Sequence, residues 1–263
     1  MRSTIRLGGV VGVVILSVIS AFVIGGIIMG FFASDPEEIN KFYLYLSFFL
    51  GQGVIILPPI YYLNIKKKPI LNSFRLNPIS VKTLQSSAVF SLGVIIIFDT
   101  FDRILHQLVQ TPDYIIDLGN IMQPESILGF VFLFLAVVIM APIGEEIVFR
   151  GFLQKFLEEH WKDITRAVLV TSLFFAMIHF NPFWTVQIYL LGVILGFLSW
   201  KTNSIIPSMV LHSMNNGIAF ILTAFDKSDF GIYLWNDNVS PIFIAIAFYL
   251  TYSGYKNIAQ NEK

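Results

Sequence analysis

The feature that most constrains the fold is a series of long apolar runs with almost no charge. The first run extends from Leu7 to Phe32, and a helix that crosses a bilayer needs about 20 mostly apolar residues. Charged residues make up 13% of the chain and cluster between the runs, whereas a soluble domain carries about 25%. The sequence therefore predicts a polytopic membrane protein of the all-α class.

Application of the length rule to the whole chain gives eight candidate spans. They lie at 8–32, 42–64, 83–103, 129–155, 166–180, 184–200, 204–223 and 239–256. These spans predict a membrane helical bundle of about eight transmembrane helices, with residues 1–263 as a single integral membrane domain. Because proline disfavours helix at the preceding residue, Asn181 predicts a break before Pro182. Pro142 and Gly144 predict a kink inside the fourth span.

The N-terminus resembles a signal peptide, because Arg2 and Arg6 precede an apolar run. A signal-peptide core has about 7–15 apolar residues and ends at an A-x-A-like site. The run from Leu7 to Phe32 is longer and shows no such site. We therefore expect an uncleaved first span.

The basic residues fall on alternate loops. With the N-terminus inside, the inner segments hold thirteen basic residues: Arg2, Arg6, Lys66, Lys67, Lys68, Arg75, Lys82, Lys155, Lys162, Arg166, Lys201, Lys256 and Lys263. The outer segments hold three, which are Lys41, Arg103 and Lys227. Because Lys and Arg are enriched in cytoplasmic loops, both termini are expected inside. The phenylalanine-rich, lysine-flanked composition is typical of a bacterial plasma membrane protein.

Composition also excludes several classes of function. The formal net charge is zero, so the chain lacks the basic footprint of a nucleic-acid-binding protein. The chain contains no cysteine, which rules out disulfides, thiolate catalysis and cysteine-type metal sites. The basic segment 65–82 is interpreted as a topology-setting linker at the inner leaflet.

Three charged residues interrupt the fourth span. Each charge at the centre of a membrane helix costs about 2.5–3.5 kcal/mol on insertion scales, yet Glu145, Glu146 and Arg150 lie within six residues of one another. Glu146 and Arg150 are four residues apart on one helical face, which predicts an ion pair that makes both tolerable. Glu145 points about 100° away and requires another partner, a proton or a function.

Further polar residues occur in the fifth and seventh spans. His179 ends the fifth, and His212 and Asn216 lie four residues apart on the seventh. At a rise of 1.5 Å per residue, the heights above the inner face are about 16 Å for Glu145 and about 20 Å for His179. His212 and Asn216 lie about 12 Å and 18 Å up on the same scale. The four residues therefore share one slab, and their convergence is possible.

These residues form three motifs in order, EExxxR, FxxxH and HxxxN. In this chain they are Glu145-Glu146-x-x-x-Arg150, Phe175-x-x-x-His179 and His212-x-x-x-Asn216. On three apolar spans the set resembles the CPBP family, which comprises the type II CAAX prenyl endopeptidases and bacterial proteins also called the Abi family. The resemblance covers roughly 125–222, the expected catalytic core.

The resemblance implies an intramembrane endopeptidase that acts on a membrane-associated or lipid-anchored peptide or protein. It assigns water activation to Glu145 and His179, oxyanion stabilisation to His212 and Asn216, and support of the geometry to Glu146 and Arg150. Phe174, Phe175 and Phe180 are interpreted as packing or lipid contacts. We expect a cavity open to the cytoplasm, because water must reach the site.

The sequence leaves alternatives open. No cofactor is needed for glutamate-dependent catalysis, but a metalloprotease could bind zinc through Glu145, His179 and His212, since two histidines and a carboxylate are a zinc-like set. Intramembrane Glu and His also serve proton-coupled transporters, and intact motifs are compatible with a non-catalytic scaffold or immunity protein. The expected partners are membrane lipid and a peptide or protein substrate, and no nucleic acid.

Overall fold

The computed structural model describes residues 5–32, 41–224 and 231–261, and these are almost entirely helical. The elements of the first half are α1 (Leu7–Phe32), α2 (Lys41–Val54), α3 (Leu57–Ile65), α4 (Ile70–Ser73), α5 (Val81–Leu108) and α6 (Asp113–Ile121). Those of the second half are α7 (Ile127–Phe134), η1 (Leu135–Met140), α8 (Ala141–Glu146), η2 (Ile147–Gln154), α9 (Lys155–Trp161), α10 (Ile164–Met177), α11 (Thr185–Thr202), α12 (Ile206–Ala224), β1 (Leu234–Trp235), β2 (Asn238–Val239) and α13 (Pro241–Asn261). The all-α prediction is confirmed.

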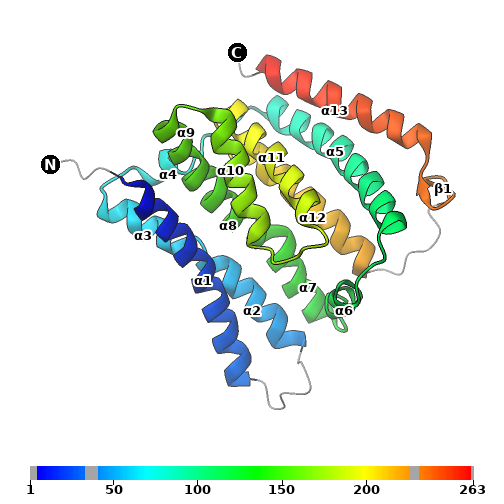
Figure 1. Ribbon diagram of the computed structural model, residues 1–263, viewed down its shortest axis with the longest axis horizontal. Helices are drawn as coiled ribbons and strands as arrows, with labels where there is room; N and C mark the ends of the chain where they lie inside the picture. Colours follow the sequence, from blue (N-terminus) through cyan, green and yellow to red (C-terminus); the bar gives the residue numbers. More distant parts are fainter. Residues whose placement is uncertain (1–4, 33–40, 225–230, 262–263) are drawn as a thin grey trace. The chain divides into compact units, whose positions relative to one another are not determined.

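The chain divides into two compact units. The first contains Met1–Pro78 and Pro124–Met209, and the second contains Ile79–Gln123 and Val210–Lys263. In the first unit, α1 packs along α2, and α10 packs along α11 (Figure 1). In the second, α5 packs along α13 for most of its length (Figure 1).

Helices occupy all eight predicted spans. Within the described ranges, four are long and apolar enough to cross a membrane: Leu7–Phe32, Lys41–Ile65, Ile127–Trp161 and Thr185–Thr202. The apolar helix Ile164–Met177 is shorter, because the chain leaves the helix before Asn181 and Pro182, where a break was predicted. The chain is therefore a multi-pass membrane protein, and a total of eight crossings stays a prediction.

Two spans differ in detail from the sequence-based expectation. The second is interrupted between α2 and α3, because Pro58 and Pro59 open α3 and lack the N–H groups that would continue α2. The fourth is helical on both sides of Pro142, and the kink predicted there stays a prediction. There the N–H of Ala141 bonds to the carbonyl of Ala136, five residues back, in a π-helical turn. A wider turn of this kind accommodates a proline whose N–H is missing.

A polar cluster fastens the β1–β2 hairpin to α5 in the second unit. The Asp99 Oδ2 atom accepts hydrogen bonds from the Tyr233 hydroxyl at 2.6 Å and from Arg103 Nε at 3.0 Å. Arg103 Nη1 also donates to the Asp237 carbonyl at 3.3 Å. Burial, and then the hydrogen bond to Asp99, raise the pKa of Tyr233. The hairpin is thus held by a protonated phenol.

Candidate active site

The predicted ion pair within the fourth span is present. Arg150 Nη1 lies 3.0 Å from Glu146 Oε1, and both side chains are fully buried. The pair joins residues four apart on one helix, as the spacing predicts. A buried charge left without its partner is strongly destabilising, so each residue makes the other tolerable inside the protein.

Arg150 makes two further contacts that the motif spacing does not reveal. Its Nη2 donates to the Gly192 carbonyl on α11 at 3.1 Å. Its guanidinium carbon lies 4.1 Å from the centre of the Phe175 ring on α10. A Cβ at position 192 would come within 3.1 Å of Ser172 and 3.3 Å of Phe175. Glycine therefore allows α11 to approach α10 closely at the level of this arginine.

A second polar contact repeats this arrangement one turn later. Gln154 is fully buried, and its Nε2 donates to the Gly196 carbonyl at 2.9 Å and to Glu158 Oε1 at 2.8 Å. A Cβ at position 196 would lie 2.6 Å from Gln154 Oε1. Arg150 and Gln154 thus tie η2 to two successive turns of α11. The sequence signal for Gln154 was its position, four residues after Arg150 and eight after Glu146.

The segment around Arg75 continues this row of polar contacts. Arg75 forms a bidentate ion pair with Glu158, and the two side chains are only 6% and 9% exposed. The Arg75 backbone has a left-handed φ of 54° and its carbonyl accepts a hydrogen bond from the Ile205 N–H at 3.1 Å. Phe74 beside it is 1% exposed. Phe74 and Arg75 of the segment 65–82 therefore pack into the first unit, and the place of this segment at the inner leaflet stays a prediction.

His179 lies beside Glu145. The Nε2 atom of His179 is 4.0 Å from Glu145 Oε2, and the side chains are 30% and 8% exposed, respectively. This distance exceeds that of a direct hydrogen bond, so the geometry leaves room for a bridging group. The structure therefore brings together the two residues to which the resemblance assigns water activation.

The ring of His179 has a defined orientation because α10 ends there. The His179 Nδ1 atom lies 2.7 Å from the Phe175 carbonyl, while the His179 backbone N–H bonds to Ala176. The last carbonyls of a helix lack intrahelical donors, and a histidine near the C-terminus can satisfy one. A carbonyl only accepts hydrogen bonds, so Nδ1 carries the hydrogen and Nε2 presents a lone pair to Glu145 when the imidazole is neutral.

When the imidazole is neutral, a donor between the two atoms would satisfy both. A water 2.8 Å from both Glu145 Oε2 and His179 Nε2 would subtend an angle of about 90° at their separation of 4.0 Å. Such a water would donate one hydrogen to each residue, leaving its lone pairs available for attack. The separation of the pair is therefore compatible with a water between the two residues.

Phe175 is a packing residue, as interpreted from the sequence, and its packing partners include residues of this site. Its ring centre is 4.8 Å from the His179 ring and 5.5 Å from the Phe149 ring. Phe175 is 1% exposed, and it lies between Arg150 and His179. The signal was its position in FxxxH, one turn before the histidine. Phe174 and Phe180 are more exposed, in agreement with the original interpretation.

His212 and Asn216 lie on α12 in the second unit, so the structure describes them apart from the first group. They are four residues apart on one uninterrupted helix and share a face. His212 is buried and Asn216 is partly exposed. The arrangement within α12 is thus the one that the HxxxN spacing predicts.

A zinc ion imposes a stricter geometry than water. Ligands about 2.0–2.1 Å from a tetrahedral ion are about 3.3 Å apart, whereas Glu145 Oε2 and His179 Nε2 are 4.0 Å apart. Among the described residues, no three His, Asp or Glu side chains are grouped as metal ligands. Metal dependence stays a prediction that experiment must test, and no step below passes through a metal.

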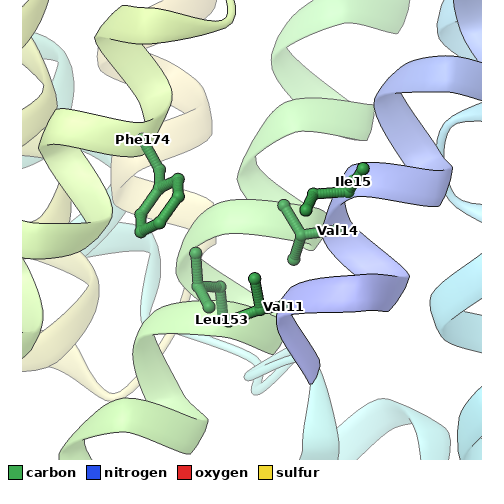
Figure 2. Close-up of a pocket in the computed structure, with 5 residues that line it drawn as sticks. All are labelled: Val11, Val14, Ile15, Leu153 and Phe174. Atoms are coloured by element: carbon green, nitrogen blue, oxygen red, sulfur yellow. The ribbon is translucent and has the colours of Figure 1, made fainter. Parts of the chain in front are cut away.

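A small apolar pocket lies between α1, η2 and α10. Figure 2 shows its lining residues, which are Val11, Val14 and Ile15 of α1, Leu153 of η2 and Phe174 of α10. All five side chains are apolar, and none belongs to the three motifs. The pocket is therefore separate from the Glu145–His179 pair, and the water-filled cavity expected there stays a prediction.

Comparison with known proteins identifies one family. Residues 127–218 match the family model described as Type II CAAX prenyl endopeptidase Rce1-like. This segment contains all three motifs, and the resemblance to the CPBP family is confirmed over it. The match supports an intramembrane endopeptidase that acts on a membrane-associated protein. No significant match was found among curated proteins or solved structures.

Proposed function

We propose that the chain is an intramembrane endopeptidase in which Glu145 and His179 activate the attacking water. The observation that carries the proposal is their 4.0 Å separation, with His179 Nδ1 bonded to the Phe175 carbonyl. Together these contacts leave a carboxylate oxygen and an imidazole lone pair facing one point. Similarity of residues 127–218 to a protease family supports the same reaction class.

The reaction begins with the water held between Glu145 and His179. Its oxygen attacks the scissile carbonyl as one of these bases takes a proton, which gives a tetrahedral oxyanion. The His212 imidazole and the Asn216 amide are proposed to donate hydrogen bonds to that oxyanion. One such donor contributes about 2.7–4 kcal/mol in known oxyanion holes. The protonated base then delivers its proton to the leaving amine as the C–N bond breaks.

Glu146 and Arg150 are proposed to support the site without contacting substrate. Their buried pair orients the Arg150 guanidinium, whose hydrogen bond to the Gly192 carbonyl joins the helix that carries Glu145 to α11. The substrate is proposed to be a membrane-associated or lipid-anchored protein at the inner face of a bacterial plasma membrane. With both termini inside, water would enter from the cytoplasmic side.

The experiment is comparative peptidomics of membranes that contain wild-type protein or the Glu145→Gln variant. Wild-type membranes should release peptides that the variant does not, and the new termini define the cleavage site. Glu159→Gln is the matched control, because Glu159 is an exposed glutamate on α9. This variant should cleave as the wild type does. If equal amounts of Glu145→Gln and wild-type protein give the same peptides, the proposal is wrong. A wild-type phenotype in that variant would instead indicate a non-catalytic scaffold.

Metal dependence is tested separately on purified protein. The proposed route needs no metal, so activity should persist after chelation when elemental analysis finds less than one metal per chain. Activity that is lost on stripping and restored by zinc would show the metal-dependent route, with Glu145, His179 and His212 as its ligands.

A further inference from the structure

Four contacts converge on Phe175, a side chain that is only 1% exposed. Its ring lies 4.1 Å from the Arg150 guanidinium carbon, 5.5 Å from the Phe149 ring and 4.8 Å from the His179 ring. Its carbonyl accepts the Nδ1–H of His179 at 2.7 Å. One residue therefore contacts both the buried ion pair and the proposed base.

The orientation of a histidine ring depends on a soft torsion. The terminal χ2 torsion of histidine is broad and roughly two-fold, and a ring flip would exchange Nε2 for a carbon atom at the position that faces Glu145. The hydrogen bond from Nδ1 to the Phe175 carbonyl favours one of the two ring orientations. The Phe175 ring packs against the imidazole at 67° and limits its rotation.

We infer that Phe175 is a positioning residue, which holds His179 in the tautomer and ring orientation that direct its Nε2 lone pair at the water beside Glu145. The inference rests on the proposed function and assigns a further member to its machinery. Arg150 acts one step further away. Glu146 and the Gly192 carbonyl hold its guanidinium in place, and the guanidinium in turn packs against the Phe175 ring.

Kinetics of Phe175→Leu test this role. The probe is an internally quenched peptide that carries the cleavage site found by the membrane peptidomics. Leucine keeps the backbone carbonyl and most of the apolar volume but removes the ring. Because small misplacements of a reacting group cost up to about a hundredfold in rate, kcat should fall about tenfold to a hundredfold while KM changes less than about twofold.

Two control variants separate positioning from packing. Phe149→Leu removes a fully buried ring that touches Phe175, and no described contact joins Phe149 to His179. Phe174→Leu changes the neighbouring ring of α10, which lines the apolar pocket (Figure 2). Both controls should keep kcat within about threefold of wild type. Equal losses in Phe149→Leu and Phe175→Leu, or an unchanged kcat in Phe175→Leu, would overturn the inference.

A spectroscopic measurement is independent of catalysis. Nitrogen NMR of isotopically labelled histidine distinguishes protonated from unprotonated ring nitrogens, and His179→Gln assigns the signals. Neutral wild-type protein should show His179 protonated at Nδ1. In Phe175→Leu the carbonyl remains, but without the packed aromatic ring the imidazole can turn away from it, so a mixture of tautomers is expected. If the wild type cleaves nothing but the tautomer of His179 still changes in Phe175→Leu, the proposed function fails and the positioning role stands. If the wild type cleaves and the tautomer is unchanged in Phe175→Leu, the positioning role is wrong.

Discussion

Loss of one member of the Glu146–Arg150 pair should destabilise the protein strongly, whereas replacement of both members should destabilise it much less. Both side chains are fully buried, and their nitrogen and oxygen atoms are 3.0 Å apart. Glu146→Gln leaves the guanidinium without its carboxylate. Breaking a buried pair in this way lowers the free energy of unfolding by about 3–5 kcal/mol. This loss corresponds to roughly two to four decades in the unfolding equilibrium constant.

Removal of both charges has a different consequence. In the double variant Glu146→Gln/Arg150→Met neither member of the pair is charged, and replacement of a whole buried pair is often neutral or even stabilising. We therefore expect the double variant to recover at least about 2 kcal/mol relative to Glu146→Gln alone. Its activity should stay low, because methionine does not reproduce the guanidinium that packs on Phe175.

The assay is reversible denaturation in detergent micelles, followed by circular dichroism, on wild type, both single variants and the double variant. Glu159→Gln serves as the exposed control and should change the free energy of unfolding by less than about 0.5 kcal/mol. If the losses of Glu146→Gln and Arg150→Met simply add in the double variant, the two charges are independent. That result would refute the reasoning.

Three further predictions concern contacts outside the pair. Gly196→Ala places a Cβ 2.6 Å from Gln154 Oε1 and should cost about 1–3 kcal/mol in thermal unfolding; a wild-type melting temperature would show that α11 does not need this close approach. Arg75→Glu and Glu158→Arg should each expose the segment around Arg75 to limited proteolysis, and the double reversal should restore protection unless the ion pair is irrelevant. The raised pKa of Tyr233 means that its stabilising effect is complete below about pH 10 and is lost as pH rises through the folded-state value. Tyr233→Phe should therefore flatten the loss of stability above about pH 10, and an unchanged pH profile would contradict this assignment.

Local spacing predicted much of the first unit. The apolar runs predicted the helices, and Asn181 before Pro182 predicted the break that follows α10. The i, i+4 rule gave the Glu146–Arg150 pair, which is present at 3.0 Å. Each of these predictions depends on residues close in sequence, where helix geometry alone fixes which side chains meet.

Contacts between distant segments were not predictable in the same way. Arg75 and Glu158 are separated by 83 residues, and nothing in a basic loop indicates that one arginine turns inward. The carbonyls of Gly192 and Gly196 accept hydrogen bonds from Arg150 and Gln154. Every residue has a backbone carbonyl, so the sequence does not indicate which carbonyls act as acceptors. Pro58 and Pro59 were visible in the sequence, but the length and apolarity of the second span masked the break that they cause.

The most direct test of the central claim is hydrolysis in heavy-oxygen water. Purified wild-type protein should incorporate one solvent oxygen into the new carboxylate of the cleaved peptide, because Glu145 and His179 activate water for direct attack. Glu145→Gln should form no labelled product at equal protein concentration, whereas Glu159→Gln should label as wild type does. Labelled product from Glu145→Gln at the wild-type rate would contradict the account.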